Sequence, residues 1–243
     1  MNRRTTFIAG SGLAALLLLL PSLGFAQSLG SASAFAILAG NKVAFTGTCT
    51  ILGSVGVSPG NSITGLPAGQ PTGGTVHNND ATAAQAQTDL GAAAAGLDGM
   101  TCGTSLNGQD LGGKTLVPGV YCFNNNAALT GALTLDAQGN ANAVWVFQIA
   151  TTFTTATNAI VNLTNGAVNT NVYWRASSAT FGSGTVFLGN VIADGSITFN
   201  TSATLNGRAL SRHAAVTMDT NFVGDPSTPT LASTWGTMKI RYR

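Results

Sequence analysis

Charged side chains are scarce in this 243-residue chain, at 7% of residues, where an ordinary soluble domain carries about a quarter. All eight acidic residues are Asp, and Glu is absent. The missing Glu weakens the case for an enzyme with paired carboxylates, and a formal net charge of +2 leaves no basic excess for binding nucleic acid. With 44% hydrophobic residues, the chain also differs from disordered chains, which combine high charge with low hydrophobicity.

Signals for cofactors and metals are missing as well. The glycine-rich stretches lack the following Lys-Ser or Lys-Thr of a phosphate-binding loop. His77 and His213 have no Cys, His or Glu partners at ligand spacing. Asp194, Arg208 and Arg212 suggest a β-helix polysaccharide lyase, but such an enzyme needs more carboxylates in register. We therefore expect no catalysis, no cofactor and no metal, and we interpret these three charges as contacts at corners of the fold.

The first 26 residues have the features of a secretory signal peptide. Arg3 and Arg4 supply the positive start, and residues 13–20 form the apolar run. Small residues at the −3 and −1 positions predict cleavage between Ala26 and Gln27. The run is shorter than the ~20 residues of a membrane span, so a transmembrane anchor is the weaker alternative. We expect a secreted, extracellular protein without membrane attachment after cleavage.

Two further segments follow the signal peptide. Residues 27–225 are expected to form one domain, and residues 226–243 a flexible C-terminal tail. The tail contains Pro229-Thr230-Leu231, which resembles the start of a bacterial sorting signal, but no apolar span follows it. We interpret it as a degenerate remnant of such a signal.

Because the protein is expected to be exported, its three cysteines are free to form disulfides. Cys102 and Cys122 flank a segment dense in Gly, so they are expected to form a disulfide. Cys49 lies among strand-like residues and is expected to be a buried, unpaired thiol.

One helix is expected at about residues 79–98. The stretch from Ala81 to Leu97 is rich in Ala and Gln and has no Pro, and Asn79 or Asp80 can cap it. Its apolar stripe is thin, so the helix needs a larger body to pack against.

The rest of the chain shows strand-like alternation in short strings that recur about every 18 to 25 residues. In each string a large apolar residue stands between small polar ones, which is typical of a β-strand. Such repeats predict stacked coils of a parallel β-solenoid. An antiparallel sandwich is the alternative, favoured by the Asn165-Gly166 and Asn206-Gly207 turn signals. The strings centre on Phe153, Phe181, Phe199 and Met218.

Alignment of these strings predicts ladders of outward-facing residues at a spacing of about 4.8 Å. The result would be a flat, uncharged array of methyl and hydroxyl groups. The first ladder is expected to hold Thr152, Thr180, Thr198 and Thr217, the second Thr154, Gly182, Asn200 and Asp219, and the third Thr157, Thr185 and Thr204.

Several motifs resemble those of the microbial ice-binding (antifreeze) protein family. The resemblance covers about residues 29 to 223. The motifs that carry it are Leu29-Gly30, Phe35 to Gly40, Gly53 to Gly60, Ala84 to Leu90, Pro118 to Cys122 and Asn206 to Leu210.

The resemblance implies a mainly β fold: a discontinuous right-handed parallel β-helix, triangular in section, with one long α-helix alongside. It also implies binding of an ice crystal surface through a flat face, without a cofactor. Some members carry a Thr-Ala/Gly-x-Thr/Asn pattern on that face, which residues 155–158 match fully. The residues expected to bind ice are Thr152, Thr154, Thr155, Thr157, Thr180, Ser183, Thr185, Thr198, Asn200, Thr201, Thr204, Thr217 and Thr220.

The sequence therefore predicts a secreted, monomeric, non-enzymatic ice-binding protein that gives thermal hysteresis and inhibits ice recrystallisation. An extracellular adhesin or polysaccharide-binding module, using the same flat face, is the alternative. A glycan-active β-helix enzyme is a weaker one, because no acidic cluster is evident.

Overall fold

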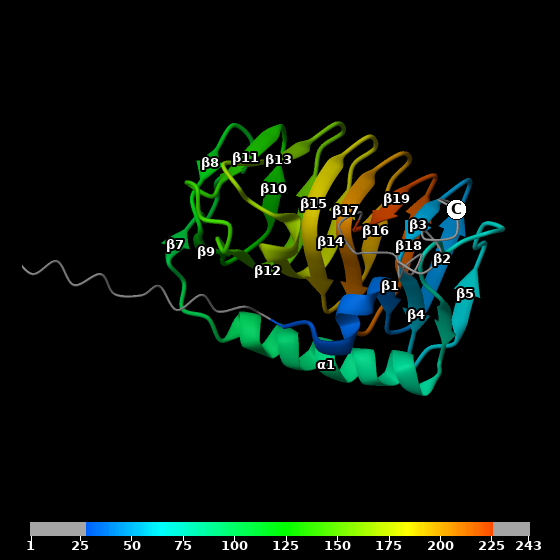
Figure 1. Ribbon diagram of the computed structural model, residues 1–243. Coiled ribbons are helices and arrows are strands. Elements are labelled where there is room, and N and C mark those ends of the chain that lie inside the picture. Colours follow the sequence, from blue (N-terminus) through cyan, green and yellow to red (C-terminus); the bar gives the residue numbers. More distant parts are fainter. Residues whose placement is uncertain (1–27, 226–243) are drawn as a thin grey trace, which may run out of the picture.

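A computed structural model describes residues 28–225, which form a right-handed parallel β-helix of triangular section (Figure 1). Nineteen strands of the described residues join one continuous sheet, and every pairing within it is parallel. The parallel register excludes the antiparallel sandwich, and it confirms the solenoid with one accompanying helix.

Each face of the β-helix is a ladder of short strands. The helix face, which α1 covers, contains β7(Thr104–Ser105), β9(Gly119–Phe123), the first halves of β12(Trp145–Thr155) and β14(Val172–Phe181), the second halves of β15(Val186–Ala193) and β17(Thr204–Ser211), and β1(Phe35–Ala39), β4(Ser54–Val57) and β6(Val76–Asn78). The threonine face contains β10(Ala127–Leu129), the ends of β12 and β14, β16(Ile197–Phe199), β18(Val216–Asp219), β2(Lys42–Thr46) and β5(Ser62–Thr64). The third face contains β8(Thr115–Leu116), β11(Ala132–Asp136), β13(Ile160–Thr164), the starts of β15 and β17, β19(Phe222–Gly224) and β3(Thr50–Leu52).

The coils are not stacked in chain order. Strands β1, β2 and β3 pair with β17, β18 and β19, so the N-terminal coils extend the end of the solenoid formed by the last strands of the chain (Figure 1). Because an uncovered strand edge offers unpaired backbone groups to other chains, this arrangement also protects β17 to β19.

Helix α1(Ala81–Asp98) runs along the helix face (Figure 1). Asp80 caps its start by accepting a hydrogen bond from the Ala83 amide at 2.8 Å. At the other end, the Gln148 side chain donates to the carbonyl oxygens of Leu97 and Met100, which satisfies two backbone groups of the helix terminus. The stripe predicted from the sequence is buried, and it comprises Ala83, Ala86, Leu90, Ala93, Ala94 and Leu97.

Two short 3-10 helices complete the secondary structure, η1(Gly30–Ala34) and η2(Asn169–Asn171). Within residues 28–225, no helix is both long enough and apolar enough to cross a membrane. The expected signal peptide and the expected C-terminal tail lie outside the described residues.

Stacked aromatic rings fill the tube. Phe147 lies against Trp174 with ring centroids 3.9 Å apart, and Tyr121 stacks on Phe147 at 5.5 Å. Further along, Phe181 and Phe199 stack at 4.6 Å. The Trp174 indole N–H donates to the Leu188 carbonyl at 2.9 Å, so its polar group is satisfied inside the core. These rings make the walls rigid, because they leave no room for neighbouring coils to shift.

The cysteines are arranged as the sequence predicts. Cys102 and Cys122 form a disulfide, which ties the segment after α1 to β9. Cys49 is a free thiol with 1% exposure.

The register of one coil differs from the sequence alignment. Phe153 lies opposite Ala179, two positions away from its expected partner Phe181, and Thr154 lies opposite Thr180. A bulge between Ile149 and Thr152 places one extra residue in β12 at this corner. Thr152 and Thr154 flank Phe153 and are the same residue type, so alternation alone does not define which of them lies opposite Thr180.

Candidate functional site

The threonine face carries a straight central row of small side chains. The strand register places them opposite one another in neighbouring coils, at a spacing of about 4.8 Å, so that seven coils span about 29 Å. None of the seven is charged. The row consists of Ala128, Thr154, Thr180, Thr198, Thr217, Ala44 and Thr64.

Contacts between coils restrict the hydroxyl groups on this face. Thr217 donates a hydrogen bond to Thr198 at 3.3 Å, and the hydroxyls of Thr152 and Ser178 lie 3.0 Å apart. Threonine is also stiff at χ1 because its β-carbon is branched. The face therefore presents methyl and hydroxyl groups at fixed positions without an ordering step.

A second row runs along the corner between the threonine face and the third face. Its turns place residues in the left-handed backbone region at the same point of successive coils, with φ between 56° and 68° in every case, and backbone hydrogen bonds link each turn to the next. The left-handed residues are Asn158, Gly184, Ser202, Thr220 and Gly47. Beside them lie the exposed Thr157 and Thr201 and the half-buried Ser183.

Thr220 is unusual among these residues, because a β-branched side chain rarely adopts a positive φ. Its φ is 56°, and a Cβ added at the neighbouring Gly47 would come within 2.3 Å of the Thr220 hydroxyl. Only glycine leaves space there. The corner therefore holds Thr220 in a strained and closely confined position.

Ten of the thirteen residues expected to bind ice lie on these two rows or beside them. Thr154, Thr180, Thr198 and Thr217 belong to the central row, and Thr152 lies next to it. The corner contains Thr157, Ser183, Asn200, Thr201 and Thr220.

The other three residues do not face the same surface. Thr155 and Thr185 are buried, at 8% and 0% exposure, and their hydroxyls lie 2.8 Å apart inside the corner. Thr204 lies opposite Val186 on the third face. The expected ladder of Thr157, Thr185 and Thr204 therefore does not form, because the chain turns the corner between them.

Sequence reasoning missed three members of the central row, one of which, Ala44, lies between Thr217 and Thr64. Ala128 and Thr64 extend the central row at its ends, although neither belongs to a long repeated string. The alternation in Ser62-Ile63-Thr64 was the available signal, but it is only three residues long.

Asp219 is a carboxylate at the edge of the threonine face. Thr201, from the preceding coil, and Thr220 both donate hydrogen bonds to it. Together with Thr46, Asn200 and Thr217 it borders a shallow hollow in the face.

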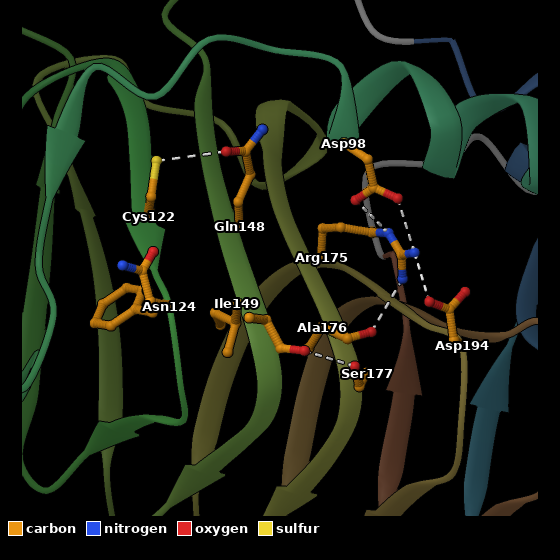
Figure 2. Close-up of a pocket in the computed structure, with 11 residues that line it drawn as sticks. Asp98, Cys122, Asn124, Gln148, Ile149, Arg175, Ala176, Ser177 and Asp194 are labelled. Atoms are coloured by element: carbon orange, nitrogen blue, oxygen red, sulfur yellow. Dashed lines mark hydrogen bonds and ion pairs between the residues drawn. The ribbon is translucent and has the colours of Figure 1, made fainter.

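A second hollow lies at the C-terminal end of α1 and is rich in charge (Figure 2). The Arg175 guanidinium donates to both Asp98 oxygens at 2.9 Å and to Asp194 at 2.6 Å, and Arg212 donates to Asp194 at 2.7 Å. Burial opposes the charge of Asp194, but hydrogen bonds and charges from the two arginines outweigh it and lower the pKa of that carboxyl. Burial also opposes the charge of Arg175, but its two carboxylate partners outweigh this and raise its pKa.

These groups satisfy one another, so the charged hollow offers no free anion or cation for a ligand. Within residues 28–225, no group of three or more His, Cys, Asp or Glu side chains could hold a metal ion. The arrangement in Figure 2 instead fastens the end of the helix to the solenoid. The threonine face remains the surface best suited to a function.

The third face differs from the threonine face in its chemistry. Its outward row begins with Ala132, Ile160 and Val186, and both Ile160 and Val186 are 39% exposed. Branched apolar side chains of different sizes make this row less even than the threonine row.

Comparisons with known proteins agree with the geometry. Residues 37–224 match a family model described as Ice-binding-like. An ice-binding protein of Nostoc sp. (strain HG1) is 48% identical over 81% of this chain and 73% of its own length, and one of Leucosporidium sp. (strain AY30) is 32% identical over 83% and 84%.

Solved structures give the same result. The crystal structure of an ice-binding protein from the Antarctic ascomycete Antarctomyces psychrotrophicus matches with a TM-score of 0.78 at 43% identity, covering 81% of this chain and 97% of that one. A structure of the antifreeze protein LeIBP from an Arctic yeast matches with a TM-score of 0.78 at 32% identity, covering 83% and 95%. The β-helix with its flanking helix, the family model and these relatives together show that the chain belongs to the ice-binding protein family.

Proposed function

We propose that the protein adsorbs to ice crystals through the threonine face and its corner row, and so inhibits ice growth and recrystallisation. The observation that carries the proposal is the central row: a straight, uncharged series of small side chains on a rigid sheet. The family relatives, which are ice-binding proteins, support the same ligand.

The chemistry of ice explains why such a face is suitable. Ice presents a periodic lattice of hydrogen-bond donors and acceptors without net charge, so ion pairs would add nothing to binding. Immobilising one mobile side chain costs roughly 0.5–1.5 kcal/mol. The stiff threonines of the row, of which Thr198 and Thr217 are already hydrogen-bonded to each other, avoid most of this cost. Bound molecules would then force the ice between them to grow with a curved front, which opposes further growth.

The proposal includes secretion and the absence of catalysis. A protein that acts on external ice must leave the cell, which agrees with the signal peptide expected in the sequence. The charged hollow at Arg175 is internally neutralised and offers no free general base, which favours a binding protein over a glycan-active enzyme. Sugar-binding proteins stack their ligands on exposed aromatic rings, and among residues 28–225 no aromatic side chain is exposed, which disfavours the polysaccharide-binding alternative.

The test compares substitutions on two faces of the same fold. Thr198→Tyr places a large ring in the centre of the threonine row, whereas Thr134→Tyr makes the same change at a half-buried position of the third face. We expect ice recrystallisation inhibition by the wild type at micromolar concentration, its loss in Thr198→Tyr, and unchanged activity in Thr134→Tyr.

Circular dichroism and melting temperature would establish that both variants are folded. Unchanged coarsening of ice grains in the presence of the wild type would refute the function. Equal losses in the two variants would refute the assignment of the face.

A further inference from the structure

Asp219 is out of place on a surface that binds a neutral lattice. A carboxylate is strongly hydrated, and ice offers no charged partner for it. We infer that Asp219 is a positioning residue that fixes the hydroxyls of Thr201 and Thr220 for ice binding and does not itself contact ice. This inference rests on the proposed function and adds a determinant of its strength.

The hydrogen bonds of Asp219 support this role. Within the described residues, its carboxylate receives hydrogen bonds only from the two threonine hydroxyls: Thr201 donates to Oδ2, and Thr220 donates to Oδ1 at 3.2 Å. No backbone amide in residues 28–225 donates to this carboxylate. By contrast, Asp110 at another corner accepts from the Gly112 and Thr130 amides as well as from the Thr130 hydroxyl, so it also holds the turn together.

The two hydroxyls acquire a defined orientation from this contact. A threonine hydroxyl has one hydrogen, and in both residues it points to the carboxylate. The outward lone pairs can therefore only accept hydrogen bonds, so the water molecules above Thr201 and Thr220 must donate to them. The methyl groups are fixed by the same rotamers, and two adjacent positions of the corner row are ordered before ice arrives.

The strain at Thr220 supports the same interpretation. The protein keeps a β-branched residue at φ 56°, and the absence of a side chain at Gly47 leaves space for its hydroxyl. The equivalent turn positions Asn158 and Gly184 carry residue types that favour this backbone region. Because Thr220 does not make this exposed turn more stable, we infer that its side chain has another role.

The experiment uses the full chain and a cycle of substitutions. Asp219→Asn keeps the shape of the side chain but converts one acceptor into a donor, so one threonine hydroxyl must turn away. The concentration that stops recrystallisation is expected to rise roughly two- to tenfold, the cost of freeing one side chain. In a Thr201→Val/Thr220→Val background, where the hydroxyls are gone, Asp219→Asn is expected to have no further effect.

Asp136→Asn on the third face is the matched control. Its carboxylate also accepts a side-chain hydrogen bond, from Asn165, together with one from the Gln138 amide, and the recrystallisation activity of this variant, measured per folded molecule, should equal that of the wild type. An unchanged activity in Asp219→Asn, or the same loss with and without the two valines, would overturn the inference while an active wild type still supported the proposed function. An inactive wild type would overturn both.

Methyl NMR relaxation of the wild type gives a measurement that needs no variant. Thr157 lies on the same corner, and its hydroxyl has no hydrogen bond within the described residues. The methyl groups of Thr201 and Thr220 are expected to be more ordered than that of Thr157, and Asp219→Asn should remove the difference without changing the melting temperature. Equal order of all three methyl groups in the wild type would contradict the positioning role.

Discussion

Arg175 is the residue on which the attachment of the α1 C-terminus depends most (Figure 2). It is 6% exposed, forms a bidentate pair with Asp98 and contacts Asp194, and its Nη1 donates to the Ala176 carbonyl at 3.0 Å. Arg175→Met keeps the unbranched stem but removes the guanidinium. The perturbation therefore removes charge and hydrogen bonds with little change in packing.

The expected loss follows from the exposure of the two partners. Removing one member of a fully buried ion pair costs about 3–5 kcal/mol, because a charge is left without water or partner. Here the side chains of Asp98 and Asp194 are 50% and 39% exposed, and Arg212 still contacts Asp194. Water can reach both carboxylates, so we expect a smaller loss of about 1–3 kcal/mol in the free energy of unfolding.

Urea unfolding and thermal melting would measure this loss. For a fold of this size, 1 kcal/mol corresponds to about 2–4 °C in melting temperature. Hydrogen exchange should increase in the last turn of α1, near Asp98, before it increases in the core strands.

Arg212→Met is the matched control, because Arg212 is more exposed and, within residues 28–225, forms an ion pair with Asp194 alone. It should cost less than Arg175→Met. A loss in Arg175→Met below that of the control, or unchanged exchange at the end of α1, would refute the reasoning.

Three further predictions concern acid, packing and the faces. The folded-state pKa of Asp194 is lowered, so this carboxylate stabilises the fold above the unfolded pKa of about 3.9, and the stabilisation is lost as pH falls through the folded-state pKa. The free energy of unfolding, measured from pH 6 to pH 2.5, should therefore fall less steeply in Arg175→Met than in the wild type. Parallel curves would contradict this. Leu90→Ala removes a side chain of 0% exposure between α1 and the helix face, and should lower the free energy of unfolding in urea by about 2–5 kcal/mol. Recrystallisation inhibition per folded molecule should not change. A selective loss of inhibition would show that the helix face takes part in binding. Thr204→Tyr should leave recrystallisation inhibition intact, because Thr204 lies on the third face opposite Val186, and a loss as large as that of Thr198→Tyr would contradict the assignment.

Much of the architecture was predictable from local patterns. Period-2 alternation in repeated strings gave the parallel solenoid, and the Ala-rich stretch after Asp80 gave the one long helix with its buried stripe. The disulfide between Cys102 and Cys122 followed from the Gly-rich segment that they flank and from the expected export. These features depend on neighbours in the chain, so the sequence contains the necessary information.

The register of the site was not predictable in the same way. Alternation indicates which residues point outward, but not which outward residues of neighbouring coils lie opposite one another, and here Thr154 instead of Thr152 pairs with Thr180. At the corners alternation stops, so Thr155 and Thr185 turn inward although their strings resemble exposed ones.

By itself, the sequence determined the kind of protein: a charge-poor, threonine-rich β-solenoid with motifs of the ice-binding family. Only the tertiary structure decided which threonines share a face, because parallel pairing joins segments far apart in the chain. It places Ala44 beside Thr217, and it brings Thr201 and Thr220 from successive coils to the same carboxylate. The scarcity of charge is thus a property of the whole chain, whereas the flat face and the role of Asp219 result from how the coils stack.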